Sequence, residues 1–196
     1  MNPIAHFQDL KQLTAGITGY EPGNPQEAGD RSVMLSLLRT HGDLLDRTNQ
    51  VAHFTGSAWI VNRERTKTLM VYHNLYRSWS WTGGHADGEA DLLSVAMREA
   101  VEETGVTQVI PLLEEIFALD ILPVWSHMRK GLFVPSHLHL NATYLLEADE
   151  TDLLVVREEE NSAVKWVPLQ EVNRYSVEPD MHAVYDKLSE RLHNFK

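Results

Sequence analysis

The sequence contains no cysteine among its 196 residues. This absence excludes disulfide bonds, thiolate metal sites and a cysteine nucleophile. Long apolar runs are also lacking, because the stretch from Ile116 to Val124 is interrupted by Asp120 and falls far short of the ~20 residues that span a bilayer. No basic segment followed by an apolar one opens the sequence, so we expect no secretory signal and a cytoplasmic location.

Positive charge is scarce as well. The chain has 17 Lys and Arg against 28 Asp and Glu, a formal net charge of −11. A general nucleic-acid binder neutralises phosphates with Lys and Arg, so this balance argues against a nucleic-acid partner. An acidic protein can still bind a small anion when a metal ion supplies local positive charge. The 43% hydrophobic and 23% charged content are typical of a globular chain that buries one core.

Residues 1–50 differ from the rest of the chain because glycine and proline divide them into short pieces. Helical patterns lie at Phe7–Leu13 and Ser32–Leu38. We interpret 1–50 as a helical extension of a main domain at 51–196. A poorly ordered leader is the alternative.

From His53 onward the pattern changes to strands mixed with two helices, without a regular βαβ rhythm, which predicts one α/β or α+β domain. A glycine that follows the first helix, Gly105, fits a left-handed cap position. The predicted strands are 54–61, 68–72, 78–81, 116–124, 137–147 and 163–167, the predicted helices are 91–104 and 180–192, and 125–136 is predicted as a loop.

The predicted helix 91–104 gathers its charged side chains on one arc. Like charges at this spacing, and acids in the last turn, are locally unfavourable. A hard divalent cation such as Mg²⁺ would reverse that penalty and could polarise a phosphoryl oxygen. An acidic face exposed to solvent is the alternative. The charged arc comprises Arg98, Glu99, Glu102 and Glu103, and the face expected to pack on a sheet comprises Leu93, Ala96, Met97, Ala100 and Val101.

The segment Gly83–Val106, GGHADGEADLLSVAMREAVEETGV, resembles the signature of the Nudix hydrolases. One position departs from it, because Ala90 stands where the signature has its first glutamate, with Glu89 and Asp91 on either side. In the family that glutamate helps to hold the loop and the helix together, often through the signature arginine. A one-residue shift would let Glu89 take this role, and a catalytically impaired nucleotide-binding or sensor module remains an alternative. The matching positions are Gly84, Arg98, Glu99, Ala100, Glu102, Glu103, Gly105 and Val106.

The resemblance covers roughly 56–169 and is closest to bacterial members with GGH in the signature and a later His-Leu-His strand. It implies an α/β/α sandwich with a mixed sheet and a hydrolase that cleaves a phosphoanhydride bond in a nucleoside-diphosphate-linked or related small substrate. It implies that Glu99, Glu102 and Glu103 ligate Mg²⁺ or Mn²⁺, with Glu103 as the general base. Arg98 would orient the carboxylates, and Glu160 would assist the metal or act as base.

The same resemblance bears on partners and rival activities. Isomerases of this fold that act on isoprenyl diphosphates use a catalytic cysteine, which this chain lacks. Homodimers are common among such proteins, and symmetric association is the usual form. ADP-ribose-like sugars, dinucleoside polyphosphates, nucleoside triphosphates and coenzyme A all fit a metal–carboxylate site.

Further residues are predicted to bind the substrate. Arg129 and Lys130 offer cations for phosphate, and Trp125 offers a ring on which a base can stack. Such residues also occur on surface loops without a role. Three histidines could bind phosphate or a second metal, or could orient the loop through hydrogen bonds. They could also form a zinc site, although their spacing matches no known motif. The full predicted substrate-binding set is Gly83, Gly84, His85, Trp125, Arg129, Lys130, His137 and His139.

Overall fold

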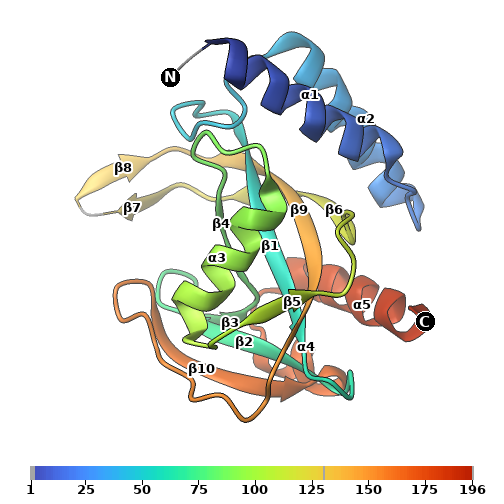
Figure 1. Ribbon diagram of the computed structural model, residues 1–196. Helices are drawn as coiled ribbons and strands as arrows, with labels where there is room; N and C mark the ends of the chain where they lie inside the picture. The colour runs from blue at the N-terminus through green and yellow to red at the C-terminus, as the bar shows by residue number, and fades with distance from the viewer. Residues whose placement is uncertain (1–2, 130, 196) are drawn as a thin grey trace. The chain divides into compact units, whose positions relative to one another are not determined.

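The computed structural model describes residues 3–129 and 131–195 (Figure 1). Strands and helices are mixed along the chain, which confirms the predicted α/β class and the helical content of the first 50 residues. The helices are α1 (Pro3–Gly19), α2 (Pro25–Thr40), α3 (Leu92–Thr104), α4 (Val172–Tyr175) and α5 (Pro179–Asn194), with a 3-10 turn at Leu169–Glu171. The strands are β1 (Ala52–Val61), β2 (Lys67–His73), β3 (Ser78–Ser80), β4 (Thr82–His85), β5 (Val109–Pro111), β6 (Ala118–Val124), β7 (His127–Arg129), β8 (Leu132–Val134), β9 (His137–Ala148) and β10 (Asn161–Pro168).

The chain forms two compact units, and each is described by itself. The first unit comprises residues 1–57, 84–95 and 115–143, and the second comprises 58–83, 96–114 and 144–196. Strands β1, β4 and β9 and helix α3 contribute residues to both. The predicted boundary between residues 50 and 51 divides the chain differently and stays a prediction.

In the first unit, α2 packs against α1 and β6. Its start is encoded locally: the side chain of Asn24 accepts a hydrogen bond from the Glu27 amide at 2.9 Å, and Pro25 fits the first helical turn. The amide of Ile121 in β6 donates to Asp30 at 2.9 Å, which fastens the helix to the strand. Both N-terminal helices are longer than predicted, and their core side chains Ile17 and Met34 are fully buried.

In the second unit, β2 lies between β1 and β10, and both pairings are antiparallel. β5 pairs with the end of β9. Helix α5 contributes Tyr185, whose ring stacks on that of Trp59 with centroids 5.7 Å apart. Both side chains are almost fully buried, so this aromatic pair forms the centre of the second unit's core.

Helix α3 buries only part of the face that its sequence predicted: Ala96 and Ala100 are buried as expected, but the buried surface extends to another side of the helix. Val101, expected on the inner side, is 37% exposed, whereas Glu103 is only 4% exposed. The buried residues follow one i, i+3, i+4 stripe that begins at Leu92 and Val95 and continues through Ala100 to Glu103. A carboxylate therefore occupies a position on the buried stripe where an apolar side chain would be expected.

The segment 125–136, predicted as a loop, contains a short hairpin. β7 and β8 pair antiparallel from His127↔Val134 to Arg129↔Leu132. Gly131 has φ +81° at the turn, a left-handed conformation that glycine adopts without strain. Strands of three residues are too short for periodicity to reveal, which also explains why β5 was not predicted.

We expect Gly105→Ala to destabilise the protein by about 1–3 kcal/mol. Gly105 has φ +74°, and an added Cβ would lie 2.6 Å from Cβ and 2.7 Å from the amide nitrogen of Val155. Denaturant unfolding followed by circular dichroism measures the change. The control is Gly29→Ala, at an exposed position of α2 with nothing within 4 Å, which should gain about 0.5–1 kcal/mol. Equal stability of Gly105→Ala and wild type would contradict the close approach of residue 155.

Candidate active site

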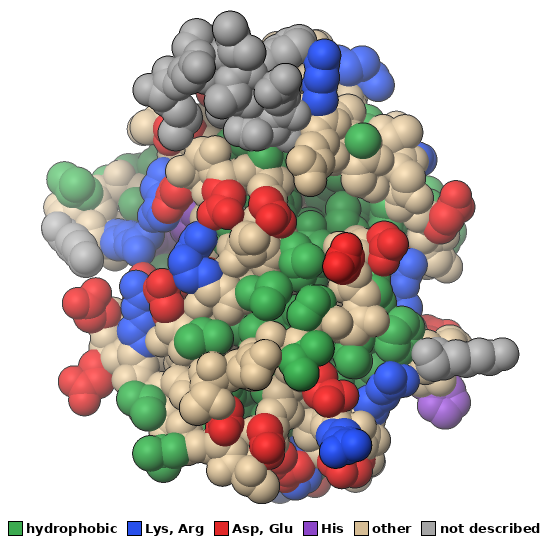
Figure 2. All heavy atoms as spheres, in the orientation of Figure 1, with side chains coloured by type: hydrophobic (Ala, Val, Ile, Leu, Met, Phe, Trp, Pro, Cys, Tyr) green, Lys and Arg blue, Asp and Glu red, His purple; other side chains and the backbone are tan. Residues whose placement is uncertain are grey.

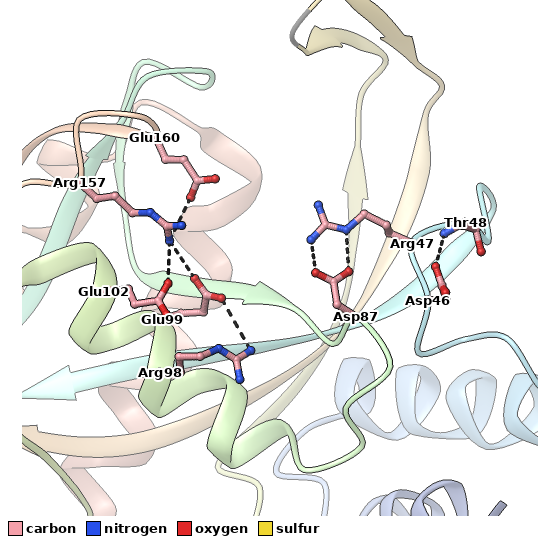
Figure 3. Close-up of polar contacts among 9 residues, drawn as sticks. All are labelled: Asp46, Arg47, Thr48, Asp87, Arg98, Glu99, Glu102, Arg157 and Glu160. Carbon is pink, nitrogen blue, oxygen red and sulfur yellow. Dashed lines mark hydrogen bonds and ion pairs between the residues drawn. The ribbon is translucent and has the colours of Figure 1, made fainter. Parts of the chain in front are cut away.

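Four acidic side chains of the second unit gather at the C-terminal half of α3. Glu99 and Glu102 come from the helix, and Glu160 comes from the turn that precedes β10 (Figure 3). Arg157 lies among them: its Nη1 is 3.1 Å from Glu102 Oε2, 3.6 Å from Glu99 Oε2 and 3.8 Å from Glu160 Oε2. Glu160, to which the family resemblance gave a role, is thus brought to the carboxylates of the helix.

Glu103 is the buried member of this carboxylate cluster, which we define as Glu99, Glu102, Glu103 and Glu160. Its Oε2 is buried without a hydrogen-bond partner among the described residues. Burial, followed by the charges of Glu99 and Glu160, raises the pKa of Glu103 to about 8, against the effect of a backbone hydrogen bond from Gly83. Burial and the charge of Glu102 also raise the pKa of Glu99. The cluster therefore holds more negative charge than its surroundings stabilise.

Backbone contacts hold Arg157 and Glu160 next to the helix. The amide of Val155 donates to the carbonyl of Thr104, the last residue of α3, at 2.8 Å, a close approach that Gly105 permits. Further along, the amides of residues 160 and 161 both donate to the carbonyl of Arg157, and Asn74 donates to that of Glu160. The chain is therefore folded into a turn that presents Arg157 and Glu160 to the acidic face of α3.

Of the two arginines of the site, the sequence predicted only Arg98. Arg98, predicted to orient the carboxylates, approaches Glu99 Oε1 to 3.9 Å through Nη2, and its side chain is 42% exposed. Arg157 was not predicted, because it lies 55 residues from Glu102 in the sequence and only the fold brings the two together. A single cation immediately before three glutamates was the signal that the sequence offered.

The residues of the carboxylate cluster fit a hard divalent cation. All of its donors are carboxylate oxygens, which Mg²⁺ and Mn²⁺ prefer. One of them, Glu103 Oε2, is buried without a partner, and the neighbouring Arg157 shows that positive charge is accommodated at this place. A cation among these oxygens would stabilise the ionised form of the buried glutamate.

The predicted histidines lie together in the first unit, joined by one that was not predicted, His53. The ring centroids of His53 lie 5.1, 4.8 and 5.1 Å from those of His85, His137 and His139. Burial is the main cause that lowers the pKa of His85 to about 3 and that of His139 to about 2. These rings are accordingly neutral at pH 7. His53 was missed because it comes from another strand, and only the fold brings it to β9.

Two further predicted binding residues, Trp125 and Arg129, lie on or near the β7–β8 hairpin of the first unit. Trp125 is 73% exposed, and Arg129 is exposed on β7. Lys130 lies outside the described residues. Nearby in the same unit, Arg47 pairs bidentately with Asp87, with its Nε 2.6 Å from Oδ1 (Figure 3). The roles of the predicted binding residues stay predictions.

Without divalent metal, we expect the wild-type protein to lose stability as the pH rises from 6.5 to 8. The pKa of Glu103 is about 8 in the folded protein and near 4.5 when unfolded, so the folded state binds more protons in this range. Melting temperatures in chelator should fall with pH for wild type and less for Glu103→Gln. Glu190→Gln, at an exposed position of α5, should behave like wild type. An equal fall in Glu103→Gln would show that another group is responsible. The window starts at 6.5 because the buried histidines, with lowered pKa values, oppose the trend below it.

Solved structures with a similar fold are hydrolases. An Ap4A hydrolase from C. elegans matches with a TM-score of 0.54 and 20% identity over 72% of this chain and 98% of its own. A NUDIX-family hydrolase from Clostridium perfringens matches with a TM-score of 0.50 and 20% identity over 74% and 98%. The E. coli dihydroneopterin triphosphate pyrophosphohydrolase matches with a TM-score of 0.52 and 16% identity over 72% and 96%. These likenesses confirm the predicted fold.

Among curated proteins, none is significantly similar in sequence to this chain. The family model of the NUDIX domain, in contrast, matches residues 53–191, which include both the carboxylate cluster and the four histidines. This match confirms the resemblance carried by Gly83–Val106 and, with it, the predicted class of enzyme. The chain belongs to the NUDIX family of hydrolases.

Proposed function

We propose that this protein hydrolyses a phosphoanhydride bond in a nucleoside-diphosphate-linked or related small substrate, with Mg²⁺ or Mn²⁺ as cofactor. The observation that carries the proposal is the convergence of Glu99, Glu102 and Glu160 on one point beside a buried, unpartnered oxygen of Glu103. Membership of the NUDIX family supports it. Two of the structures with a similar fold are named as an Ap4A hydrolase and a triphosphate pyrophosphohydrolase.

Glu99, Glu102 and Glu103 are the residues that would hold the cation, with Glu160 beside them. A divalent ion bound there supplies Lewis acidity for a phosphoryl oxygen and lowers the pKa of an attacking water. Arg157 has its guanidinium among the same carboxylates and can pair with phosphate oxygens of the substrate. The cation and Arg157, both within the second unit, would then compensate the negative charge of the carboxylates and of the substrate.

Glu103 is the residue that we assign as general base. Its burial keeps water from screening the carboxylate, and Oε2 has a free lone pair because no described group donates to it. Glu160, which the sequence also singled out, could serve either as a metal ligand or as the base. Arg98 is assigned the positioning of Glu99, whose Oε1 it approaches.

We assign substrate contacts to the residues that the sequence predicted for this role. The backbone at Gly83 and Gly84 offers close approach, and Arg129 and Trp125 offer charge and a stacking surface. His85, His137 and His139 were predicted for the same role. The substrate panel described below determines which nucleotide or coenzyme these residues select.

The acidic surface of the protein indicates which kind of partner it binds. Acidic side chains are spread over the face shown in Figure 2, with Lys and Arg interspersed among them, which favours a small metal-bound anion over nucleic acid. Among the described residues, no helix is long and apolar enough to cross a bilayer. We further propose a cytoplasmic location, a homodimer, and a division into a helical extension at 1–50 and the catalytic domain at 51–196.

We expect metal-dependent turnover of at least one member of a substrate panel, lost on Glu103→Gln by at least ~10²-fold in kcat, since a general base and a metal ligand are removed together. The panel comprises ADP-ribose, dinucleoside polyphosphates, nucleoside triphosphates and coenzyme A, each with Mg²⁺, Mn²⁺ or chelator, with products separated by chromatography. Glu158→Gln is the matched control, because this exposed glutamate lies two positions before Glu160 and should retain full activity.

Two results would contradict this assignment. A loss below tenfold in Glu103→Gln would remove Glu103 from the mechanism. Nucleotide binding by calorimetry without products, in every metal, would identify a binding module and make Ala90, the departure from the family signature, the first position to restore to glutamate.

A further inference from the structure

We infer that three histidines of the first unit, His53, His137 and His139, form a binding site for a transition-metal ion of the zinc type. One ring nitrogen from each lies within 4.8 Å of the others. The donors are imidazoles alone, which favour Zn²⁺, Ni²⁺ or Cu²⁺ over Mg²⁺. The site is therefore chemically different from the carboxylate cluster, whose donors are oxygens. It does not depend on the proposed hydrolase activity.

The spacing of the two β9 histidines already matches such an ion. His137 and His139 point to the same face of the strand because successive side chains alternate. Their Nε2 atoms are 3.2 Å apart. Two nitrogens bound to one tetrahedral Zn²⁺ at 2.0–2.1 Å lie about 3.3 Å apart. The strand alone thus sets two ligands at the separation that a tetrahedral ion requires.

Of the two ring nitrogens of the third ligand, His53, only Nδ1 has a hydrogen-bond partner among the described residues. Nδ1 contacts the backbone carbonyl of Asn49 at 3.0 Å, so it carries the proton and donates. Nε2 then keeps its lone pair, and it is buried with no partner among the described residues in a side chain that is 3% exposed. A buried acceptor without a donor is costly. A metal ion would satisfy it.

His137 has the same tautomer. Its Nδ1 contacts the carbonyl of Pro135 at 2.9 Å, which places the proton on Nδ1 and leaves Nε2 as an acceptor. Metal-binding histidines almost always donate their second ring N–H to a carbonyl or carboxylate, which fixes the tautomer. Without metal, His139 Nε2–H donates to His137 Nε2, so metal binding requires only that the proton of His139 move to its other ring nitrogen.

The fourth position of the ion is the open one. His85 packs against the cluster, with its ring centroid 5.0 Å from that of His139, and could orient a water bound there. The charges around His85 include Arg47, which is paired with Asp87, and Arg129. The charge of Arg129, beside that of a divalent ion, favours an anion, such as hydroxide or phosphate, as the remaining ligand of the ion.

Zinc uptake by untagged protein tests the inference. Equilibrium dialysis against Zn²⁺, in buffer with millimolar Mg²⁺ to occupy oxygen sites, should leave one Zn²⁺ per chain by elemental analysis. The double variant His137→Gln/His139→Gln should lose it, with at least a tenfold weaker affinity. Glu99→Gln/Glu103→Gln should retain it. The matched histidine control is His41→Gln/His193→Gln, two exposed histidines outside the cluster, which should also retain it.

A second measurement guards against a variant that merely unfolds. His53→Asn keeps a polar side chain at the buried position, and its circular dichroism in chelator establishes whether it is folded. Zn²⁺ should raise the melting temperature of wild type and not that of His53→Asn, because only a ligand of the native state stabilises it. No Zn²⁺ on wild type, equal uptake by the His137→Gln/His139→Gln protein, or loss of Zn²⁺ in the carboxylate variant would overturn the site.

Discussion

The repulsion among the carboxylates at the end of α3 is the constraint that the rest of the second unit has to compensate. Glu103 takes a place on the buried stripe of the helix, and its charge is opposed both by burial and by the neighbouring Glu99 and Glu160. In a region of low dielectric such repulsion is costly unless a cation compensates it. Arg157 supplies one such charge, and the left-handed Gly105 allows the segment that carries it to pass close to the helix end. The turn at 157–161 and the start of β10 hold Arg157 in contact with the glutamates of the helix.

Much of this candidate site could be predicted from the sequence because three of its carboxylates are close together in the chain. Glu99, Glu102 and Glu103 share one helix, so spacing alone places them together, and the surrounding glycines complete a recognisable signature. Arg157 and His53 escaped prediction because their neighbours in space are remote in sequence, and only strand pairing and loop closure bring them in. Helix periodicity also misjudged Val101 and Glu103, because it assumes that buried positions are apolar. At a functional site that assumption fails first.

The two clusters of the chain illustrate how donor chemistry separates metal preferences. Oxygen donors with crowded charge suit a hard ion that activates a phosphate, whereas neutral imidazoles with carbonyl-anchored tautomers suit a softer one. Burial lowers the pKa of His85 and His139 and so keeps both rings neutral, and burial raises the pKa of Glu99 and Glu103. Burial thus acts on both sets of ligands, and an ion in each would relieve a cost that the folded chain otherwise bears.

The claim that the carboxylate cluster exists to bind a divalent cation is tested most directly by Mn²⁺ binding without substrate. Electron paramagnetic resonance of free Mn²⁺, titrated with protein, counts the bound ions. The account predicts loss of free signal with wild type, and at least a tenfold weaker affinity in Glu99→Gln/Glu103→Gln. It also predicts that Arg157→Gln binds Mn²⁺ at least as tightly as wild type, because the resident cation is gone. Equal binding by wild type and the double glutamate variant, or none by either, would contradict it.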